Sequence, residues 1–314
     1  MVETPERGTP MDTNVKKNVL VTGGNRGLGE ETARQLLALG HHVFITARNP
    51  SEGEAARTRL LAAVPQGRLE VLTLDLASLE SVRTAARAFL DRHIPLHVLI
   101  ANAGYYNTAN VRQQTADGFE MHFGTNHLGH FLLTVLLQEA LVAGAPARVV
   151  LLSSGLHKGM MGQKPAAVDF DNLDLQRGTF SGVGAYSISK LCNVLFAREL
   201  TRRWSARGVT ANAASPRMVP TTVARHTSGM QKFLMERIFP LLPFSRTPEQ
   251  AARNTVFAAL DPSLEGKGGL YLEDMKVAQP SAAALDDATA RRLWDVSETL
   301  VGLGSTPQPQ ATHA

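Results

Sequence analysis

The sequence predicts an α/β protein made of one domain, in which seven parallel strands form a doubly wound sheet with helices on both faces. Short apolar runs rich in β-branched residues alternate along the chain with segments of helical periodicity. Alternation of this kind favours a parallel sheet covered on both sides. The 314 residues, of which 44% are hydrophobic, are enough for one large core, and no interior linker interrupts them.

The periodicity places each element in order. We expect strands at residues 15–22, 42–47, 69–74, 96–102, 148–153, 210–214 and 269–272. We expect helices at residues 29–39, 52–63, 79–92, 119–142, 185–207, 248–260 and 288–301. Ser78 is the expected N-cap of the third helix, because its hydroxyl can accept a hydrogen bond from a first-turn amide.

Both ends of the chain differ in composition from the domain at residues 15–303. Residues 1–14 are polar with two prolines, and residues 304–314 contain proline and glutamine, so we expect both segments to be disordered. Residues 1–14 lack the apolar core of a signal peptide, and no later run reaches the length of a membrane-spanning helix. We therefore expect no transmembrane anchor.

Charge and cysteine content narrow the functional class. The chain has 32 Lys and Arg against 28 Asp and Glu, and they are scattered, so we expect no nucleic-acid partner. The single cysteine, Cys192, excludes an intramolecular disulfide and favours a reducing, cytoplasmic environment, and we interpret it as a packing residue.

The ten histidines show no ligand spacing, so we expect no metal. Three of them on the helix at residues 119–142 are interpreted as structural: His122, His127 and His130.

The first strand runs into the sequence TGGNRGLG at residues 22–29 and then into a helix. Glycines at such a junction let the backbone approach a pyrophosphate, whose charge the helix amides meet. The alternative is a tight turn without a ligand, but the spacing favours a dinucleotide site and a Rossmann fold. The residues expected at this site are Gly23, Asn25, Arg26, Gly27, Leu28 and Gly29.

The charge at the end of the second strand bears on the choice of dinucleotide. An acidic side chain there usually grips an unphosphorylated ribose, whereas a 2'-phosphate calls for arginine. This chain has Arg48 at that point and Arg26 within the glycine loop. Either arginine alone could be a solvated surface residue, but the two together favour NADP(H) over NAD(H).

Tyr186 and Lys190 lie four residues apart on one face of the helix at residues 185–207. A nearby ammonium favours the phenolate and can lower a phenol pKa from about 10 toward the range of an acid-base catalyst. The same spacing also fits an ordinary pair of neighbouring side chains, so the rest of the chain decides between the two interpretations.

Further motifs appear in the order typical of the short-chain dehydrogenases/reductases, a family that this sequence resembles over residues 15–301. Besides the glycine loop, the matching positions are Asp75, Leu76, Asn102, Ala103, Gly104, Asn126, Ser154, Tyr186 and Lys190. The sequences YSISKLCN at 186–193 and ARRLWDVS at 290–297, with the long insert at 155–184, resemble the retinol dehydrogenase and WW-domain oxidoreductase branch. That branch mostly uses NADP(H) and includes many membrane-anchored members, whereas no anchor is expected here.

The resemblance implies a role for each catalytic position. Tyr186 would exchange the proton with the substrate oxygen while hydride passes to or from the nicotinamide, and Ser154 would hold that oxygen. Lys190 would lower the pKa of Tyr186 and bind the nicotinamide ribose, and Asn126 would hold a water on a proton path from Lys190. The resemblance assigns the remaining positions to the cofactor: Asp75, Leu76, Asn102, Ala103, Gly104, Tyr186, Lys190, Pro216, Val219 and Thr221.

One position departs from the family pattern, because Arg217 stands where the family has glycine. If that backbone has a positive φ, an arginine there is strained by about 1 kcal/mol or more. Either this loop differs from that of the family, or Arg217 faces an acidic group on the substrate.

Residues 222–246 occupy the place of the family's substrate lid and are unusually apolar. They favour an apolar ketone, aldehyde or alcohol as substrate, although core packing, a dimer contact or membrane association would also explain them. We predict an NADP(H)-dependent oxidoreductase, with a homodimer or homotetramer allowed. The alternative is a dinucleotide-binding regulatory or scaffold protein with little turnover.

Overall fold

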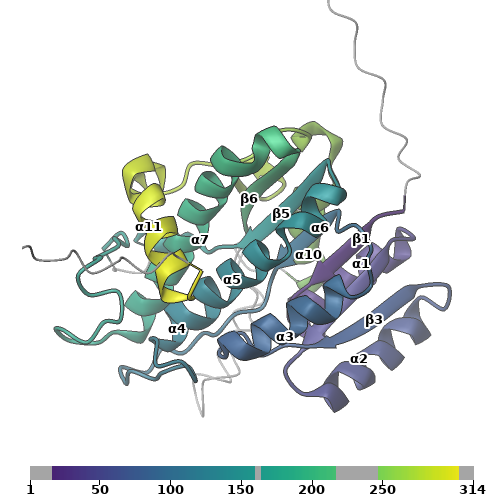
Figure 1. Cartoon of the computed structure of the whole chain (residues 1–314), viewed down its shortest axis with the longest axis horizontal. Coiled ribbons are helices and arrows are strands. Elements are labelled where there is room, and N and C mark those ends of the chain that lie inside the picture. Colours follow the sequence, from purple (N-terminus) through teal and green to yellow (C-terminus); the bar gives the residue numbers. More distant parts are fainter. Residues whose placement is uncertain (1–15, 160–163, 217–246, 304–314) are drawn as a thin grey trace, which may run out of the picture.

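A parallel sheet with one short antiparallel edge strand forms the centre of the molecule (Figure 1). This computed structural model describes residues 16–159, 164–216 and 247–303. The strand order is β3-β2-β1-β4-β5-β6-β7-β8, and β8 alone is antiparallel to its neighbour, β7. The strands are β1 (Asn18–Val21), β2 (His42–Ala47), β3 (Arg68–Thr73), β4 (Val98–Ala101), β5 (Ala147–Leu152), β6 (Val209–Ser215), β7 (Tyr271–Glu273) and β8 (Lys276–Val277).

The helices cover both faces of the sheet, as expected. One core lies under α1, α2 and α10, and a larger one under α3, α5, α6, α7 and α11, of which α3, α5 and α7 are in front of the sheet in Figure 1. The helices are α1 (Gly27–Ala38), α2 (Pro50–Ala63), α3 (Leu79–Leu90), α4 (Met121–Phe123), α5 (Gly129–Leu136), α6 (Gln138–Ala143), α7 (Gly182–Trp204), α10 (Pro248–Leu260) and α11 (Asp287–Leu300).

The sheet order places the carboxyl ends of β1 and β4 at a point where the chain reverses direction across the sheet. From β1 the chain moves outward to β2 and β3, and it then returns to the other side of β1 with β4 and β5. In open α/β sheets, ligands bind in the crevice at such a switch point. Of the two strands that flank it, β4 is buried along its whole length and β1 at all but its first residue, as expected when both faces are covered.

The single long helix expected at residues 119–142 is wrong, because α4, a π turn η1 (Gly124–Leu128), α5 and α6 replace it. Close packing requires glycine at both ends of the π turn. A Cβ on Gly124 would lie 2.4 Å from Thr115 Cγ2, and one on Gly129 would lie 2.5 Å from the Leu76 carbonyl oxygen. Apolar periodicity does not register these contacts, since they arise from segments distant in the sequence.

The other elements agree with expectation to within a few residues. Ser78 caps α3, its Oγ accepting a hydrogen bond from the Ser81 amide at 3.3 Å. Cys192 is fully buried in α7, which confirms that it is a packing residue. Strand β8 was not expected, because two residues are too short to show a periodicity.

Some expectations concern segments outside the described residues. The expected disordered ends at 1–14 and 304–314 and the expected lid at 222–246 lie there, as do Arg217, Val219 and Thr221. Within the three described ranges, no helix combines the length and the apolar character needed to cross a bilayer.

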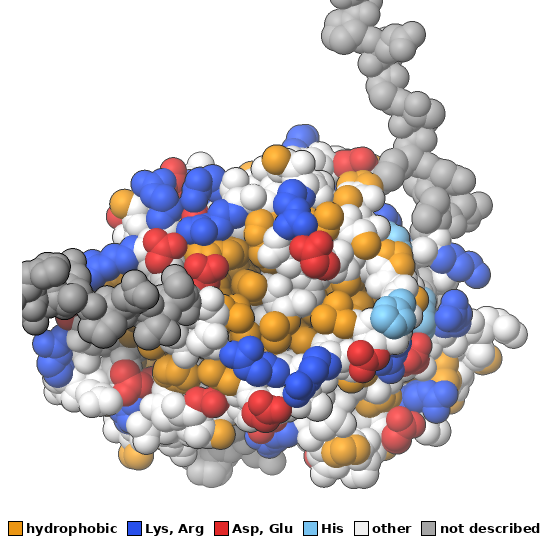
Figure 2. All heavy atoms as spheres, in the orientation of Figure 1, with side chains coloured by type: hydrophobic (Ala, Val, Ile, Leu, Met, Phe, Trp, Pro, Cys, Tyr) orange, Lys and Arg blue, Asp and Glu red, His pale blue; other side chains and the backbone are white. Residues whose placement is uncertain are grey.

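On the face formed by α3, α5, α7 and α11, Lys and Arg side chains alternate with Asp and Glu (Figure 2). Two ion pairs on this side join Arg203 to Asp295 at 2.9 Å and Arg207 to Glu139 at 3.0 Å. Exposed pairs of this kind contribute about 0–1 kcal/mol each. The apolar contacts beneath the helices therefore hold this layer on the sheet.

Two neutral histidines lie in the larger core. His127 Nε2 is 2.9 Å from Ser297 Oγ on α11, and burial lowers the pKa of His127 to about 3. His130 lies in α5, and burial lowers its pKa to about 4. Both values are below the 6.5 of an unfolded histidine, so the unfolded chain binds more protons at these two sites.

We predict that the free energy of unfolding is highest above pH 6.5 and falls as the pH drops toward 4. Each of the two buried histidines should account for a loss on the order of 3 kcal/mol over this window. Urea unfolding at a series of pH values measures it, and His127→Phe should flatten the curve between pH 6.5 and 4.5. His93→Asn is the matched control because His93 is exposed. A His127→Phe curve as steep as that of the parent protein would contradict the prediction.

Candidate active site

The glycine loop between β1 and α1 is packed so tightly that a side chain at Gly23 or Gly29 would not fit. We call this loop the cradle. Gly23 has a φ of +64°, and a Cβ on Gly29 would lie 2.3 Å from the Gly23 carbonyl oxygen and 2.5 Å from Asn102 Nδ2. The Asn102 amide donates to the Thr22 carbonyl at 2.8 Å, and the Gly23 amide donates to Thr46 Oγ1 at 3.1 Å. The loop is thereby fixed between the carboxyl ends of β2 and β4.

The amino end of α1 points into this cradle. Arg26 occupies the N-cap position, and its side chain does not cap the helix. The first amides of α1 are therefore available to an anion, and the aligned peptide dipoles favour negative charge there. A narrow glycine turn followed by an uncapped helix end fits the pyrophosphate of a dinucleotide.

The two arginines expected at the 2'-phosphate are both exposed. Within the residues described, neither Arg26 nor Arg48 forms an ion pair with a carboxylate. A different arginine braces the outer side of the loop, since Arg59 pairs with Glu30 at 2.8 Å and donates to the Asn25 carbonyl at 3.1 Å.

The other positions expected to bind the cofactor lie at the same end of the sheet. Asp75 Oδ1 accepts from the Ala77 amide at 3.0 Å, which fixes the turn after β3. Leu76 is buried, and its carbonyl lies against the helix at Gly129. Ala103 donates its amide to Thr22 Oγ1 at 2.9 Å, which joins the turn after β4 to the glycine loop. Pro216 follows β6 directly.

Ser154, Tyr186 and Lys190 come together where β5 ends beside α7. The Ser181 hydroxyl caps α7, so that Tyr186 lies near the start of the helix. Ser154 is the second residue after β5, and its hydroxyl lies close enough to the Tyr186 phenol to lower the pKa of that phenol. Lys190 Nζ donates to the Leu152 carbonyl at 3.0 Å and is 5.4 Å from the centre of the Tyr186 ring.

The pKa of Tyr186 is raised in the structure, whereas the sequence led us to expect that Lys190 lowers it. Burial raises the pKa of Tyr186 well above its usual value, and the neighbouring Tyr106 phenol raises it further. The hydrogen bond with Ser154 acts in the opposite direction, because a hydroxyl can donate to the phenolate. Burial also lowers the pKa of Lys190 to about 8. Burial therefore keeps the phenol in its neutral, protonated form.

Asn126 lies in the π turn η1 and joins three parts of the site. Its Oδ1 accepts from the Tyr105 amide at 2.7 Å, and its Nδ2 donates to the Tyr105 carbonyl at 3.0 Å and to Ser189 Oγ at 2.9 Å. Both hydrogens of the side-chain amide and one lone pair of Oδ1 are thus engaged with protein groups, and the second lone pair of Oδ1 is left for a further donor. The backbone carbonyl of Asn126 accepts from His130 Nδ1 at 3.0 Å.

Sequence reasoning missed three side chains that surround the catalytic cluster. The Tyr106 ring packs edge-on against Tyr186 with centres 4.7 Å apart, and the His122 ring lies 6.2 Å from it. His157 forms a hydrogen bond through Nδ1 with the Ser154 carbonyl, and its Nε2 accepts from the Ser281 amide at 3.2 Å. Two of these residues could have been found from their closeness to a motif. Tyr106 lies two residues after Asn102-Ala103-Gly104, and His157 lies three residues after Ser154.

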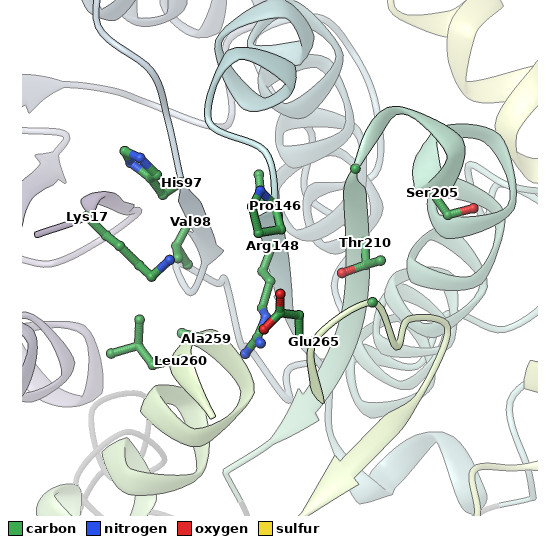
Figure 3. A pocket seen from close by; sticks show the side chains of 13 residues that line it. Lys17, His97, Val98, Pro146, Arg148, Ser205, Thr210, Ala259, Leu260 and Glu265 are labelled. Atoms are coloured by element: carbon green, nitrogen blue, oxygen red, sulfur yellow. The ribbon is translucent and has the colours of Figure 1, made fainter. Parts of the chain in front are cut away.

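A separate hollow of about 190 Å³ lies at the opposite edge of the sheet, where the strands begin (Figure 3). Lys17 and Arg148 line it, and Arg148 points toward Glu265. Helix α10 ends beside it, and Arg148 Nη1 donates to the Asp261 carbonyl at 2.8 Å. Cations at helix carboxyl ends stabilise the free carbonyls, so this hollow has a structural explanation. No cluster of potential metal ligands occurs within the described ranges.

Comparison with known proteins agrees with this geometry. The family model described as short chain dehydrogenase matches residues 17–166. The chain is 41% identical over 288 residues to the WW domain-containing oxidoreductase of Pongo abelii, which covers 91% of this chain and 68% of that protein. It is 40% identical over 302 residues to retinol dehydrogenase 14 of Homo sapiens, covering 91% and 87%. The Pseudomonas aeruginosa RhlG complex with NADP has a TM-score of 0.65 at 25% identity, covering 86% and 96%.

We predict that Gly29→Ala destroys the cradle, because the added methyl group overlaps the Gly23 carbonyl. The variant should lose on the order of 2 kcal/mol of stability and most of its binding to NADPH, measured by urea unfolding and fluorescence titration. Gly184→Ala is the matched control, since its methyl group would meet only the Ser181 side chain, at 3.3 Å. Parental NADPH binding by Gly29→Ala would show that the loop is an ordinary turn.

Proposed function

Because the chain belongs to the short-chain dehydrogenase family, a family of oxidoreductases, we propose that it interconverts an apolar ketone or aldehyde and the corresponding alcohol with NADP(H). The observation that carries the proposal is the cluster of Ser154, Tyr186 and Lys190 at the sheet edge that also bears the glycine cradle. An enzyme of this type needs a proton donor beside a dinucleotide. At this end of the sheet, the Tyr186 phenol would be the donor and the cradle would hold the dinucleotide.

The residues of the cluster have complementary roles in reduction. A bound nicotinamide dinucleotide supplies the hydride, which adds to the carbonyl carbon. The Tyr186 phenol gives its proton to the carbonyl oxygen, and the Ser154 hydroxyl, in contact with that phenol, holds the same oxygen. Lys190 stabilises the phenolate that forms, because its ammonium lies over the Tyr186 ring. In alcohol oxidation, the proton and the hydride both move in the opposite direction.

Preference for NADP(H) rests on the two arginines beside the cradle. A 2'-phosphate carries negative charge that a guanidinium binds with two parallel hydrogen bonds. Arg48 follows β2 directly, and Arg26 precedes α1, so both backbones border the adenosine side of the cradle. RhlG, a structural relative, is complexed with NADP, which supports the same choice. Gly23, Asn25, Gly27, Leu28 and Gly29 would hold the pyrophosphate.

The substrate proposal rests on apolar surroundings of the reacting group. The Tyr106 ring packs edge-on against Tyr186, and the sequence at residues 222–246 is rich in Phe, Leu and Met. Retinol dehydrogenase 14, a relative, bears the name of an apolar alcohol. A cytoplasmic location and a homodimer or homotetramer stay predictions from the sequence, as does the alternative of a regulatory protein that binds a dinucleotide without turnover.

We predict that Tyr186→Phe loses at least about a hundredfold in kcat while it still binds NADPH. The phenol supplies the proton, whereas the cradle binds the nucleotide through other residues. The assay follows NADPH oxidation with a panel of apolar aldehydes and ketones, and a fluorescence titration measures binding. Tyr105→Phe removes a hydroxyl outside the catalytic cluster and serves as the control. Parental turnover by Tyr186→Phe would overturn the mechanism, and binding without turnover by the parent protein would favour the regulatory alternative.

We predict that Arg48→Ala weakens NADPH binding by about tenfold or more, since a hydrogen bond to a charged group contributes about 1.5–3 kcal/mol. NADH binding should hardly change, because NADH lacks the 2'-phosphate. Arg87→Ala, which removes an exposed arginine on α3, is the control. Equal affinity of the parent protein for both nucleotides, unchanged in Arg48→Ala, would contradict NADP(H) preference.

A further inference from the structure

His130 lies between the glycine loop and the π turn that carries Asn126, and it contacts both. Its ring is 1% exposed in α5. Nε2 is 2.9 Å from Thr22 Oγ1, at the start of the glycine loop, and Nδ1 is 3.0 Å from the carbonyl oxygen of Asn126 in the π turn. One imidazole therefore spans the distance between the two halves of the site.

The direction of these hydrogen bonds follows from the groups involved. A carbonyl oxygen can only accept, so Nδ1 carries the ring proton and Nε2 accepts from the Thr22 hydroxyl. The Thr22 hydroxyl is 3.4 Å from the Ile100 carbonyl, a longer contact than the one to His130. Thr22 Oγ1 in turn accepts the Ala103 amide at 2.9 Å. The chain of donors runs from the turn after β4, through Thr22 and His130, to Asn126.

Beyond Asn126, the connection continues to the catalytic tyrosine. Asn126 Nδ2 donates to Ser189 Oγ at 2.9 Å, and Ser189 Oγ donates to the Tyr186 carbonyl at 2.7 Å. Thr22, Asn126 and Ser189 are buried like His130. Buried hydrogen bonds of this kind hold their partners in one geometry, since an unpaired group would be costly.

We propose that His130 is a positioning residue that couples the glycine loop to the catalytic cluster, so that the arrangement that binds the dinucleotide also fixes Asn126 and Tyr186. The inference rests on the proposed function and adds a residue to it. Its Nε2 side orients Thr22 at the loop, and its Nδ1 side holds the π turn. The two ring nitrogens therefore have effects that can be separated by substitution.

Three variants separate these effects. His130→Phe removes both contacts and should raise the Kd for NADPH about fivefold or more and lower kcat. His130→Asn keeps a short amide donor for the Asn126 carbonyl, so it should restore kcat toward the parental value while the Kd stays raised. Thr22→Val, which also removes the acceptor of the Ala103 amide, should raise the Kd alone. Combined with His130→Phe, it should raise the Kd by less than its separate effect, because the two variants share the contact between Thr22 and His130.

His127→Phe is the matched control, because His127 lies one turn away in the same core and contacts α11 instead of the loop. It should lower the thermal midpoint and leave the Kd and kcat unchanged. Circular dichroism verifies that each variant is folded. A folded His130→Phe or Thr22→Val protein with parental Kd and kcat would overturn the inference alone. A parent protein that binds no NADPH would overturn the proposed function together with it.

Discussion

One backbone carbonyl, that of Leu152, fixes the position of α7 relative to the end of β5. It accepts hydrogen bonds from Lys190 Nζ at 3.0 Å and Asn193 Nδ2 at 2.9 Å, which engage both of its lone pairs. A third bond, from Ser153 Oγ to the Lys190 carbonyl at 2.8 Å, runs beside them. The position of Tyr186 over the end of β5 depends on this contact, because the phenol is one helical turn from Lys190.

The attachment of α7 to β5 uses Lys190, a cation, at a buried position where an apolar side chain would have a lower desolvation cost. The Lys190 side chain is 4% exposed, and burying an ammonium without a carboxylate partner is unfavourable. The cost appears as the lowered pKa of Lys190, and burial correspondingly raises that of Tyr186. Burial thus favours the neutral phenol before reaction, while Lys190, with a pKa of about 8, still carries its proton at neutral pH. Local rules of stability are commonly broken in this way at functional sites.

The sequence predicted the features that are encoded within one element or one turn. The strand and helix order, the Ser78 cap and the narrow glycine turn depend on neighbours in the chain, and residue types alone indicated them. The π turn at Asn126 and the contacts of His130 and His157 could not be predicted, since they join segments far apart in the sequence. The direction of the Tyr186 pKa was missed for the same reason, because burial is decided by the packing of other elements.

The π turn η1 inserts one extra residue into the helical segment between α4 and α5, compared with a regular α-helix. Each residue in an α-helix advances the side chains by about 100° around the axis. Deleting one residue between Gly124 and Leu128 would therefore restore a regular helix and swing α4 around the axis relative to α5. His122 would turn away from Tyr186 while His130 kept its place. The geometry beside Tyr186 thus depends on the length of this segment as well as on its side chains.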